Sequence, residues 1–419
     1  MSTPTSDPAQ PSEGSRRVQP WDAFRHRDYR FLWVTGFAST VLLWIRILVT
    51  TQWLFEETGS EAMLGIVGIV QLFVQIPALL WGGALSDRID RKRLIATANT
   101  ISLVVLLAMG LLDASDSLTV PVVFAGIAVS AGAQMMVNPA RSALTPATVP
   151  ERHLMLAVAT DTASQNAAAI VGPIVFAVVA SVFGLTTAFM VGAAVAVPAL
   201  LAPLFIRVAG RAEGGSNGST IARIREGFWF VVRHPILPGL FLLDTGNTVV
   251  SFYREILPAL ARGLFRAGAA GTGALGAANS AGAILGAMMA LFFSEYRAKG
   301  MLVLYASMVY AVALFGFGSV NQLWMGIVMI AILGGADSVT VAVRHTTVQL
   351  TTPDHMRGRA FSFMILSAQT ANNIGTIWVG FWAAAIGPGN TMVLGGVIAV
   401  LATVLVWRVW RPIREYRYP

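Results

Sequence analysis

Three acidic side chains stand inside long apolar runs of this 419-residue chain, where they could carry protons. They are Asp244 in the stretch FLLDTGN, Glu255 in YREIL and Asp337 in LGGAD. Because a charge held away from water is costly, an acid at such a position is by default a functional candidate. A shielded carboxyl group can also bind and release a proton near neutral pH. We therefore expect a proton-coupling role for Asp244 first, then for Asp337 and Glu255.

Other polar side chains of the apolar runs could bind a solute. Arg46 can hold an anionic group or pair with Glu255 or Asp244, while amide and aromatic side chains can hydrogen-bond or stack. The candidates for a substrate cavity are Arg46, Asn138, Asn247, Tyr253, Asn279 and Asn372. Structural roles are the alternative: Asp244 can pair with Arg344, Asp337 can hydrogen-bond between helices, and amides can link neighbouring helices.

The composition around these residues is that of a membrane protein. Only 12% of the residues are charged and 55% are hydrophobic, whereas a soluble domain has about 25% charged residues. Apolar runs of about 20 residues, long enough to cross a bilayer as helices, recur along the chain. The sequence therefore predicts an all-α polytopic membrane protein surrounded by lipid.

The same sequence offers little for enzyme chemistry. It has no cysteine, so no disulfide or thiolate site can form, and its five histidines lack paired metal-ligand spacing. The phosphate-cradling pattern G-x-x-x-x-G-K-[ST] does not occur. We predict a protein that is not an enzyme, with no cofactor, no metal and no nucleic acid as partner.

The apolar runs predict twelve transmembrane helices in two sets of six. The expected spans are residues 31–55, 62–85, 94–112, 119–140, 154–182, 186–207, 236–260, 271–293, 300–319, 323–343, 359–386 and 391–410. Glycine, serine and asparagine between the sixth and seventh spans indicate a linker. We expect a disordered tail at 1–28, six-helix bundles at 29–209 and 234–410, a linker with a short helix at 210–233 and a tail at 411–419.

The basic residues orient these helices. If the chain starts in the cytoplasm, all but four of the 29 lysines and arginines fall on the cytoplasmic side, whereas acids such as Glu56 and Asp113 fall outside. The four exceptions are Arg46, Arg254, Arg262 and Arg266. This positive-inside bias predicts that both termini are cytoplasmic. The first twenty residues lack the apolar region of a cleaved signal peptide, so we expect a multi-pass protein of the inner (cytoplasmic) membrane.

The two halves of the chain resemble each other. One constant shift in numbering, which places Arg141 on Arg344, also places Pro150 on Pro353 and leads from Gly172 to Gly375. Parallel repeats about an axis normal to the membrane are a transporter architecture, with the substrate site at the repeat interface. A duplicated channel or membrane enzyme is the alternative of another class.

A charged loop stands between the second and third spans, where six of the seven residues from Asp87 to Arg93 are charged. Glycines and paired charges suit a joint that locks one conformation and releases it, whereas basic residues alone would suffice to retain the loop inside. The loop resembles the G-x-x-x-D-R-x-G-R-R/K signature of the major facilitator superfamily, with Asp90 in place of the second glycine. We expect a conformational latch of Gly83, Asp87, Arg88, Asp90, Arg91, Arg141 and Arg344.

Two further segments are similar to exporters of that superfamily. Gly172-Pro173 resembles the core of the exporters' fifth-helix motif, although a kink for packing is the plain alternative. Asn138-Pro-Ala-Arg141 and the stretch from Gln349 to Arg359 resemble the bacterial subgroup that includes the enterobactin exporter and multidrug efflux proteins. The resemblance implies two pseudo-symmetric six-helix bundles around a central cavity, and it implies export.

These observations predict a secondary active transporter that works by alternating access. We expect a monomeric proton-coupled antiporter that exports a hydrophobic or amphiphilic small molecule of the drug or siderophore type. A lipid or lysophospholipid transporter, or a uniporter without proton coupling, is the nearest alternative. A channel or a membrane enzyme would leave the repeat and the latch loop unexplained.

Overall fold

The computed structural model describes residues 21–135, 137–208, 220–293 and 295–417, with side chains for all of these except residues 80–88, 138, 220, 221, 223, 354 and 355. Within these ranges every regular element is a helix, which confirms the predicted all-α class. The predicted N-terminal tail lies largely outside the described residues, as does the part of the predicted linker from 210 to 219.

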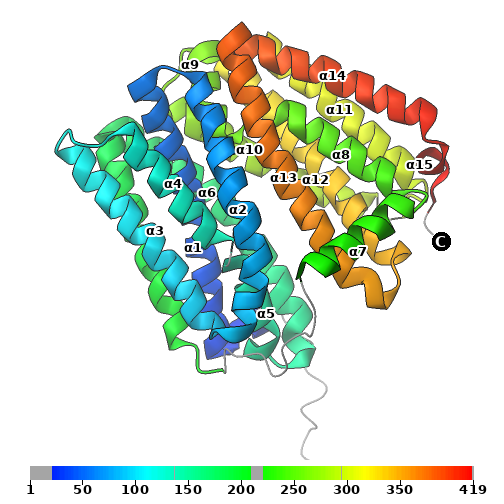
Figure 1. Cartoon of the computed structure of the whole chain (residues 1–419), viewed down its shortest axis with the longest axis horizontal. Coiled ribbons are helices and arrows are strands. Elements are labelled where there is room, and N and C mark those ends of the chain that lie inside the picture. Colours follow the sequence, from blue (N-terminus) through cyan, green and yellow to red (C-terminus); the bar gives the residue numbers. More distant parts are fainter. Residues whose placement is uncertain (1–20, 136, 209–219, 294, 418–419) are drawn as a thin grey trace, which may run out of the picture.

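The first half of the chain forms one group of packed helices, drawn in blue to green in Figure 1. Its long helix α6 packs against both α1 and α3, while α4 packs against α2 and α3. The elements are η2 (Asp22–Arg25), α1 (Arg27–Thr58), α2 (Glu61–Arg88), α3 (Arg91–Ala114), α4 (Val120–Gln134), α5 (Val137–Thr148), α6 (Glu151–Leu201) and η3 (Ala202–Phe205).

Helix α6 contains two of the predicted spans. A straight helix of its 51 residues would be about 77 Å long, more than twice the apolar thickness of a bilayer. Gly184 breaks it with φ 86° and ψ 172°, a conformation that a residue with a Cβ rarely adopts. The chain therefore turns at Gly184 and crosses back, as the separate predicted spans 154–182 and 186–207 require.

The second half of the chain forms the other group, drawn in green to red in Figure 1. Here α10 packs on α12, α11 packs on α12 and α14, and α13 packs on α7 and α8. The elements are α7 (Thr220–Arg233), α8 (Leu237–Ser251), η4 (Arg254–Ile256), α9 (Leu257–Phe265), α10 (Ala269–Phe292), α11 (Lys299–Ser319), α12 (Leu323–Thr351), α13 (Asp354–Ile386), α14 (Pro388–Val409) and α15 (Arg411–Glu415).

The predicted seventh span, 236–260, is not one continuous helix. Helix α8 ends at Ser251, and Phe252 has ψ 94°, outside the helical range. After the short 3-10 turn η4, α9 restarts with Pro258 in its first turn, where a proline costs no helical hydrogen bond. The backbone is therefore non-helical at Phe252 and Tyr253 and forms only a 3-10 turn from Arg254 to Ile256.

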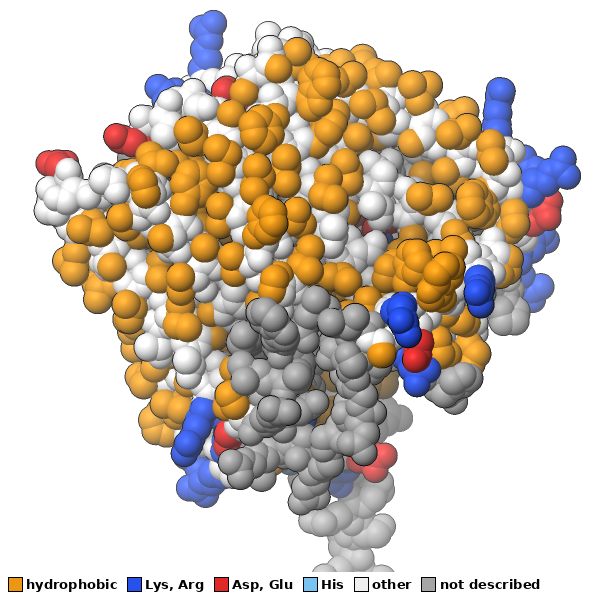
Figure 2. Space-filling view, viewed as in Figure 1, with side chains coloured by type: hydrophobic (Ala, Val, Ile, Leu, Met, Phe, Trp, Pro, Cys, Tyr) orange, Lys and Arg blue, Asp and Glu red, His pale blue; other side chains and the backbone are white. Residues whose placement is uncertain are grey.

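Membrane character is plain from length, composition and surface. Among the described residues, nine helices are long and apolar enough to cross a membrane, with α6 counted once. Neither α13 nor the broken α8–α9 pair is among the nine, so the predicted count of twelve is only partly reached. Figure 2 shows hydrophobic side chains spread over the face of the molecule and charged side chains gathered toward its edges. Apolar side chains such as Phe73, Phe292 and Leu401 are more than 60% exposed, as lipid contact requires.

The two groups of helices meet along α2 with α13 and along α6 with α10. On the first seam a Cβ added to Gly380 would lie 2.3 Å from the Cα of Gly65. On the second seam a Cβ added to Gly273 would lie 2.4 Å from the carbonyl oxygen of Pro173. Only glycine permits these backbones to approach so closely.

The apolar core is joined at one end of the molecule and divided at the other. We call the end with the α1–α2 turn at Gly59 the outer end, and the end with the α2–α3 turn at Asp90 the inner end. Near the outer end one hydrophobic cluster includes Leu54 and Phe55 of the first group and Leu257 and Leu260 of the second. Toward the inner end each group has its own cluster. The two groups are therefore closed against each other at the outer end and separate at the inner end.

Candidate functional site

A cavity of about 300 Å³ lies among the helices of the second group, and Trp44 of α1 completes its wall from the first group. Because α1, α8, α10, α11, α12 and α13 all contribute to its wall, it lies deep in the bundle. Its lining residues are Trp44, Asp244, Thr248, Ser251, Phe252, Tyr253, Arg254, Asn279, Tyr310, Asp337, Val341, Arg344, Ala368 and Asn372. This mixture of aromatic, amide and charged side chains suits an amphiphilic solute.

The unwound segment after α8 shapes this cavity. Three consecutive side chains, Phe252, Tyr253 and Arg254, line the wall, whereas in a helix successive side chains point about 100° apart. Non-helical backbone at membrane depth is tolerated where it lines a cavity. The Tyr253 hydroxyl donates a hydrogen bond to Asn279 Oδ1 over 2.7 Å, and the Arg254 guanidinium lies 5.0 Å from the Phe252 ring centroid. The break in the helix therefore presents aromatic and cationic groups at one place.

The two acids of the cavity differ in their partners. Asp244 of α8 forms an ion pair with Arg344 of α12, in which both side chains are at most 10% exposed. Asp337 lies two turns before Arg344 on α12, and among the described residues it has no ion pair and no hydrogen bond. It is exposed to the cavity and also lines an adjoining small pocket with Asn247. An acid at this position can bind a proton or a solute without breaking another contact.

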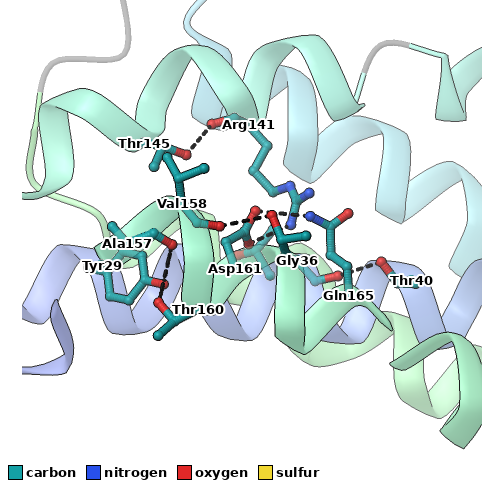
Figure 3. A network of polar contacts seen from close by, with 12 residues as sticks. Tyr29, Gly36, Thr40, Arg141, Thr145, Ala157, Val158, Thr160, Asp161 and Gln165 are labelled. Atoms are coloured by element: carbon teal, nitrogen blue, oxygen red, sulfur yellow. Dashed lines mark hydrogen bonds and ion pairs between the residues drawn. The ribbon is translucent and has the colours of Figure 1, made fainter. Parts of the chain in front are cut away.

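Arg141, the repeat counterpart of Arg344, has a different kind of partner. Figure 3 shows its side chain beside Asp161 and Gln165 of α6, directly over Gly36 of α1. Arg141 Nη1 lies 3.0 Å from Asp161 Oδ1, and Gln165 Nε2 donates to Asp161 Oδ2 over 2.9 Å. Nearby, the Tyr29 hydroxyl donates to the Ala157 carbonyl oxygen over 2.9 Å. These contacts bind the inner halves of α1, α5 and α6 to one another.

A buried polar cluster closes the wall between the cavity and the outer end. Glu255 is fully buried and receives hydrogen bonds from Arg254, at 3.1 and 2.9 Å, and from Thr376 of α13, at 3.3 Å. Arg46 of α1 is 4% exposed, interacts electrostatically with Glu255 and Arg254, and is not among the residues that line the cavity. The cluster therefore contains a buried acid between cations from both halves of the chain.

Amide groups add a second contact between the halves. Gln369 and Asn373 of α13 both donate to Gln75 Oε1 of α2, over 2.6 and 3.1 Å. Toward the outer end, Thr272 of α10 donates to Gln52 Oε1 of α1 over 2.8 Å. Each bond must break if the two groups of helices move apart at this end.

The predicted latch residues are described only in part. Gly83, Asp87 and Arg88 belong to the inner end of α2, where the side chains are outside the described residues. Asp90 caps α3 by accepting a hydrogen bond from the Lys92 amide over 2.9 Å, and this explains an acid in place of the signature's glycine. Arg91 donates to the Ala143 carbonyl oxygen over 3.4 Å. A latch across the two halves stays a prediction.

The Gly172-Pro173 pair lies between helices of both halves. A Cβ on Gly172 would lie 2.7 Å from Trp44 Cβ of α1, and Pro173 packs against Gly276 of α10. A relative movement of the two halves would therefore change the contact between Pro173 and α10. Of the other predicted residues, Asn372 lines the cavity, whereas the side chain of Asn138 is outside the described residues.

Sequence reasoning missed Tyr310 of α11. Its hydroxyl forms a 2.6 Å hydrogen bond with Ser251 Oγ, and its ring lines both the cavity and the small pocket beside Asp337. Tyrosine is enriched at the ends of membrane spans. The position of Tyr310 in the middle of a predicted span was therefore the signal that could have identified it.

Comparison with known proteins decides the family. Residues 18–416 match the family described as transmembrane secretion effectors. The chain belongs to this family of major facilitator transporters. It is 26% identical over 400 residues to the enterobactin exporter EntS of Escherichia coli (strain HS) and to that of Shigella boydii (serotype 18), covering 94% of both chains in each case.

Solved structures agree on the fold. The nucleoside transporter NupG matches with a TM-score of 0.75 and 13% identity, over 93% of this chain and 99% of its own. A bacterial homologue of the human lysosomal transporter Spinster, in an inward-facing and unoccupied conformation, matches with a TM-score of 0.66 and 16% identity, over 94% and 99%. The chain is thus a multi-pass secondary transporter of a small molecule and not an enzyme.

Proposed function

We propose that this transporter exports a hydrophobic or amphiphilic small molecule in exchange for protons. The observation that carries the proposal is the carboxyl group of Asp337, which lines the central cavity and has no ion pair or hydrogen bond among the described residues. Sequence reasoning ranked Asp244 first, but Asp244 pairs with Arg344, so we assign the exchangeable proton to Asp337. Export is supported by the relatives, which are exporters of the siderophore enterobactin.

Alternating access follows from the way the halves meet. The outer end is closed by apolar packing, by the Glu255 cluster and by the hydrogen bond from Thr272 to Gln52, whereas the inner end has two separate cores. We propose that substrate enters from the inner, cytoplasmic end while Asp337 is ionised. Rocking of the halves then opens the outer end, where a proton binds Asp337 and the substrate leaves. The protonated carrier returns and releases the proton inside.

The aromatic wall favours a substrate with flat or apolar surface. Trp44, Phe252, Tyr253 and Tyr310 line the cavity together with Asn279 and Asn372. Such a wall can stack on rings and hydrogen-bond their polar edges. A siderophore, a dye or an aromatic antibiotic fits this chemistry. We further propose that the transporter is a monomer of the inner membrane with both termini in the cytoplasm.

Uptake into vesicles tests the proposal. Purified transporter is sealed into vesicles, a pH gradient is imposed, and accumulation of dyes, antibiotics, siderophores and lysolipids is measured one at a time. A proton-coupled exporter accumulates a substrate only when the gradient is present and only in vesicles that expose the inner end of the protein. Equilibration of a substrate across the membrane without regard to the pH gradient would instead identify a uniporter, and transport of lysolipids alone would identify a lipid transporter.

A further inference from the structure

A second hollow, of about 770 Å³, lies at the inner end of the molecule. It shares no lining residue with the transport cavity. It is formed by the last two turns of α7, the turn into α8 and the first turns of α13. Its lining residues are Arg225, Glu226, Trp229, Phe230, Arg233, His234, Pro235, Met356 and Arg359. We call it the α7 groove. It has no part in the proposed transport cycle.

The α7 groove contains three arginines, one with an acidic partner and two without one among the described residues. Arg359 is bound to Glu226 over 2.6 Å, and this ion pair fastens α7 to α13. Arg225 and Arg233 form no ion pair with any described residue, although both line the groove. The Arg233 guanidinium lies over the Trp229 ring at 5.3 Å, which fixes its position beside the hollow. The described side chains therefore leave an excess of positive charge at this site.

His234 adds a neutral donor to these charges. Its Nδ1 accepts hydrogen bonds from the amides of Ile236 and Leu237, at 3.2 and 3.3 Å, so its proton is on Nε2. Burial lowers the pKa of His234 below its ordinary value of 6.5, which keeps the ring neutral at pH 7. The groove thus offers hydrogen-bond donors of both charged and neutral kinds.

The position of the groove matches the level of lipid headgroups. Helix α8 begins at Leu237, immediately after the groove, and its Leu242 is 59% exposed on the apolar surface. On α7 itself Phe228, Trp229 and Val232 are 39%, 49% and 45% exposed. Figure 2 shows basic side chains standing among hydrophobic ones over α7. Aromatic and basic residues mixed in this way are typical of helices that lie in the membrane interface.

The face of α7 that carries Gly227 and Phe228 packs against α13. A Cβ added to Gly227 would lie 2.3 Å from the carbonyl oxygen of Arg359, and Phe228 packs edge-on against Phe363. A headgroup in the α7 groove would therefore contact a rigid junction of α7, α8 and α13. Since α8 and α13 also line the transport cavity, the occupant would stabilise helices that form the substrate site.

We propose that the α7 groove binds the headgroup of an anionic phospholipid of the inner leaflet, with the phosphate held by Arg225 and Arg233. The apolar walls of Phe230, Pro235 and Met356 would face the glycerol and the first acyl carbons. The proposal is independent of proton coupling.

Lipid binding to the full-length purified transporter in detergent tests the proposal. Phosphatidylglycerol or phosphatidylcholine is added at equal mole fraction, and bound lipid is counted by native mass spectrometry. We expect phosphatidylglycerol to be retained and Arg225→Gln with Arg233→Gln to weaken its binding about tenfold. The matched control, Arg411→Gln with Arg414→Gln, removes the same charge from α15 at the same end of the molecule and should retain the lipid. Equal loss in both double variants would overturn the site.

A variant of opposite sign guards against loss of folding. Glu226→Gln removes the acid that occupies Arg359, so phosphatidylglycerol should bind more tightly than to the wild type. Weaker binding in Glu226→Gln would contradict the proposal. Inorganic phosphate at millimolar concentration is the last arm: if it displaces phosphatidylglycerol and stabilises the protein equally, the groove is a site for soluble phosphates and the lipid assignment is overturned.

Discussion

Arg344 of α12 pairs with Asp244 of α8, whereas Asp337, two turns earlier on α12, faces the same cavity without a basic partner among the described residues. The ion pair joins two helices of the second half and neutralises both members. The unpaired acid is free to change its charge. This division assigns a structural task to Asp244 and the exchange of protons to Asp337.

Replacing Asp337 should separate proton coupling from transport. In Asp337→Asn the cavity keeps its shape but no longer carries an exchangeable proton, so substrate accumulation driven by a pH gradient should fall at least about tenfold. Exchange of substrate at equal concentrations across the membrane should continue. Asp116→Asn, in an exposed turn with positive φ that asparagine also adopts, is the control. Gradient-driven accumulation that survives in Asp337→Asn would refute the assignment.

The Asp244–Arg344 pair should matter for stability. Asp244→Asn leaves the Arg344 guanidinium buried without its counter-ion, which costs about 3–5 kcal/mol. Arg344→Gln should cost a similar amount, while the double variant should recover much of the loss because neither charge remains. Thermal unfolding followed by tryptophan fluorescence measures this. If the double variant melts as low as the sum of the single effects, the two side chains are not coupled.

Closure of the outer end depends on the contact between Gly65 and Gly380. Gly380→Leu places a side chain where the Cα of Gly65 would be only 2.3 Å from its Cβ, so the outer end should stay open and transport should stop. A cysteine at Asn372, introduced into this cysteine-free chain, should then react with a membrane-impermeant thiol reagent added at the outer side. Gly358→Leu is the control on the same helix, because a side chain there meets open space. In this variant the introduced cysteine should stay unreactive toward the reagent. Slow labelling in Gly380→Leu would disprove this role of the glycine pair.

Acid should loosen the junction between the N-terminal segment and α6. His26 Nε2 lies 2.9 Å from His153 Nδ1, and burial together with His153 and Arg152 lowers the pKa of His26, despite the opposing effect of Asp22. Since the folded-state value is depressed, this contribution to stability is complete above about pH 6.5 and is lost as pH falls toward the folded pKa. The melting temperature should therefore drop on acidification, and less so in His26→Gln. An equal drop in both proteins would exclude the pair as the cause.

Much of the helical architecture could be predicted because apolar runs and positive loops are local signals. Helices occupy most of each predicted span, with a break in the seventh, and a fold of this family was expected from the loop after the second span. The break after Ser251 was not predicted, because Phe252 and Tyr253, where the helix stops, are aromatic residues that membrane helices also contain. Only the tertiary requirement to line a cavity explains the unwound backbone.

Partners were harder to predict than positions. Arg141 and Arg344 are equivalent in the repeat, yet one pairs with Asp161 of the following helix and the other with Asp244 of α8. Sequence spacing cannot separate these outcomes, because both depend on which helices become neighbours. In the same way Asp90 was expected in a latch, and its observed contact is a local N-cap at the start of α3. The charged residues around Asp90 made an N-cap hard to recognise in the sequence.

Proton movement measured together with substrate movement tests whether Asp337 carries the exchanged proton. Sealed vesicles containing the wild type or Asp337→Asn receive a transported substrate, and internal pH is followed with a trapped dye. We expect a substrate-dependent proton flux in the wild type that is absent in Asp337→Asn. Substrate movement without proton flux in the wild type, or an undiminished flux in Asp337→Asn, would contradict it.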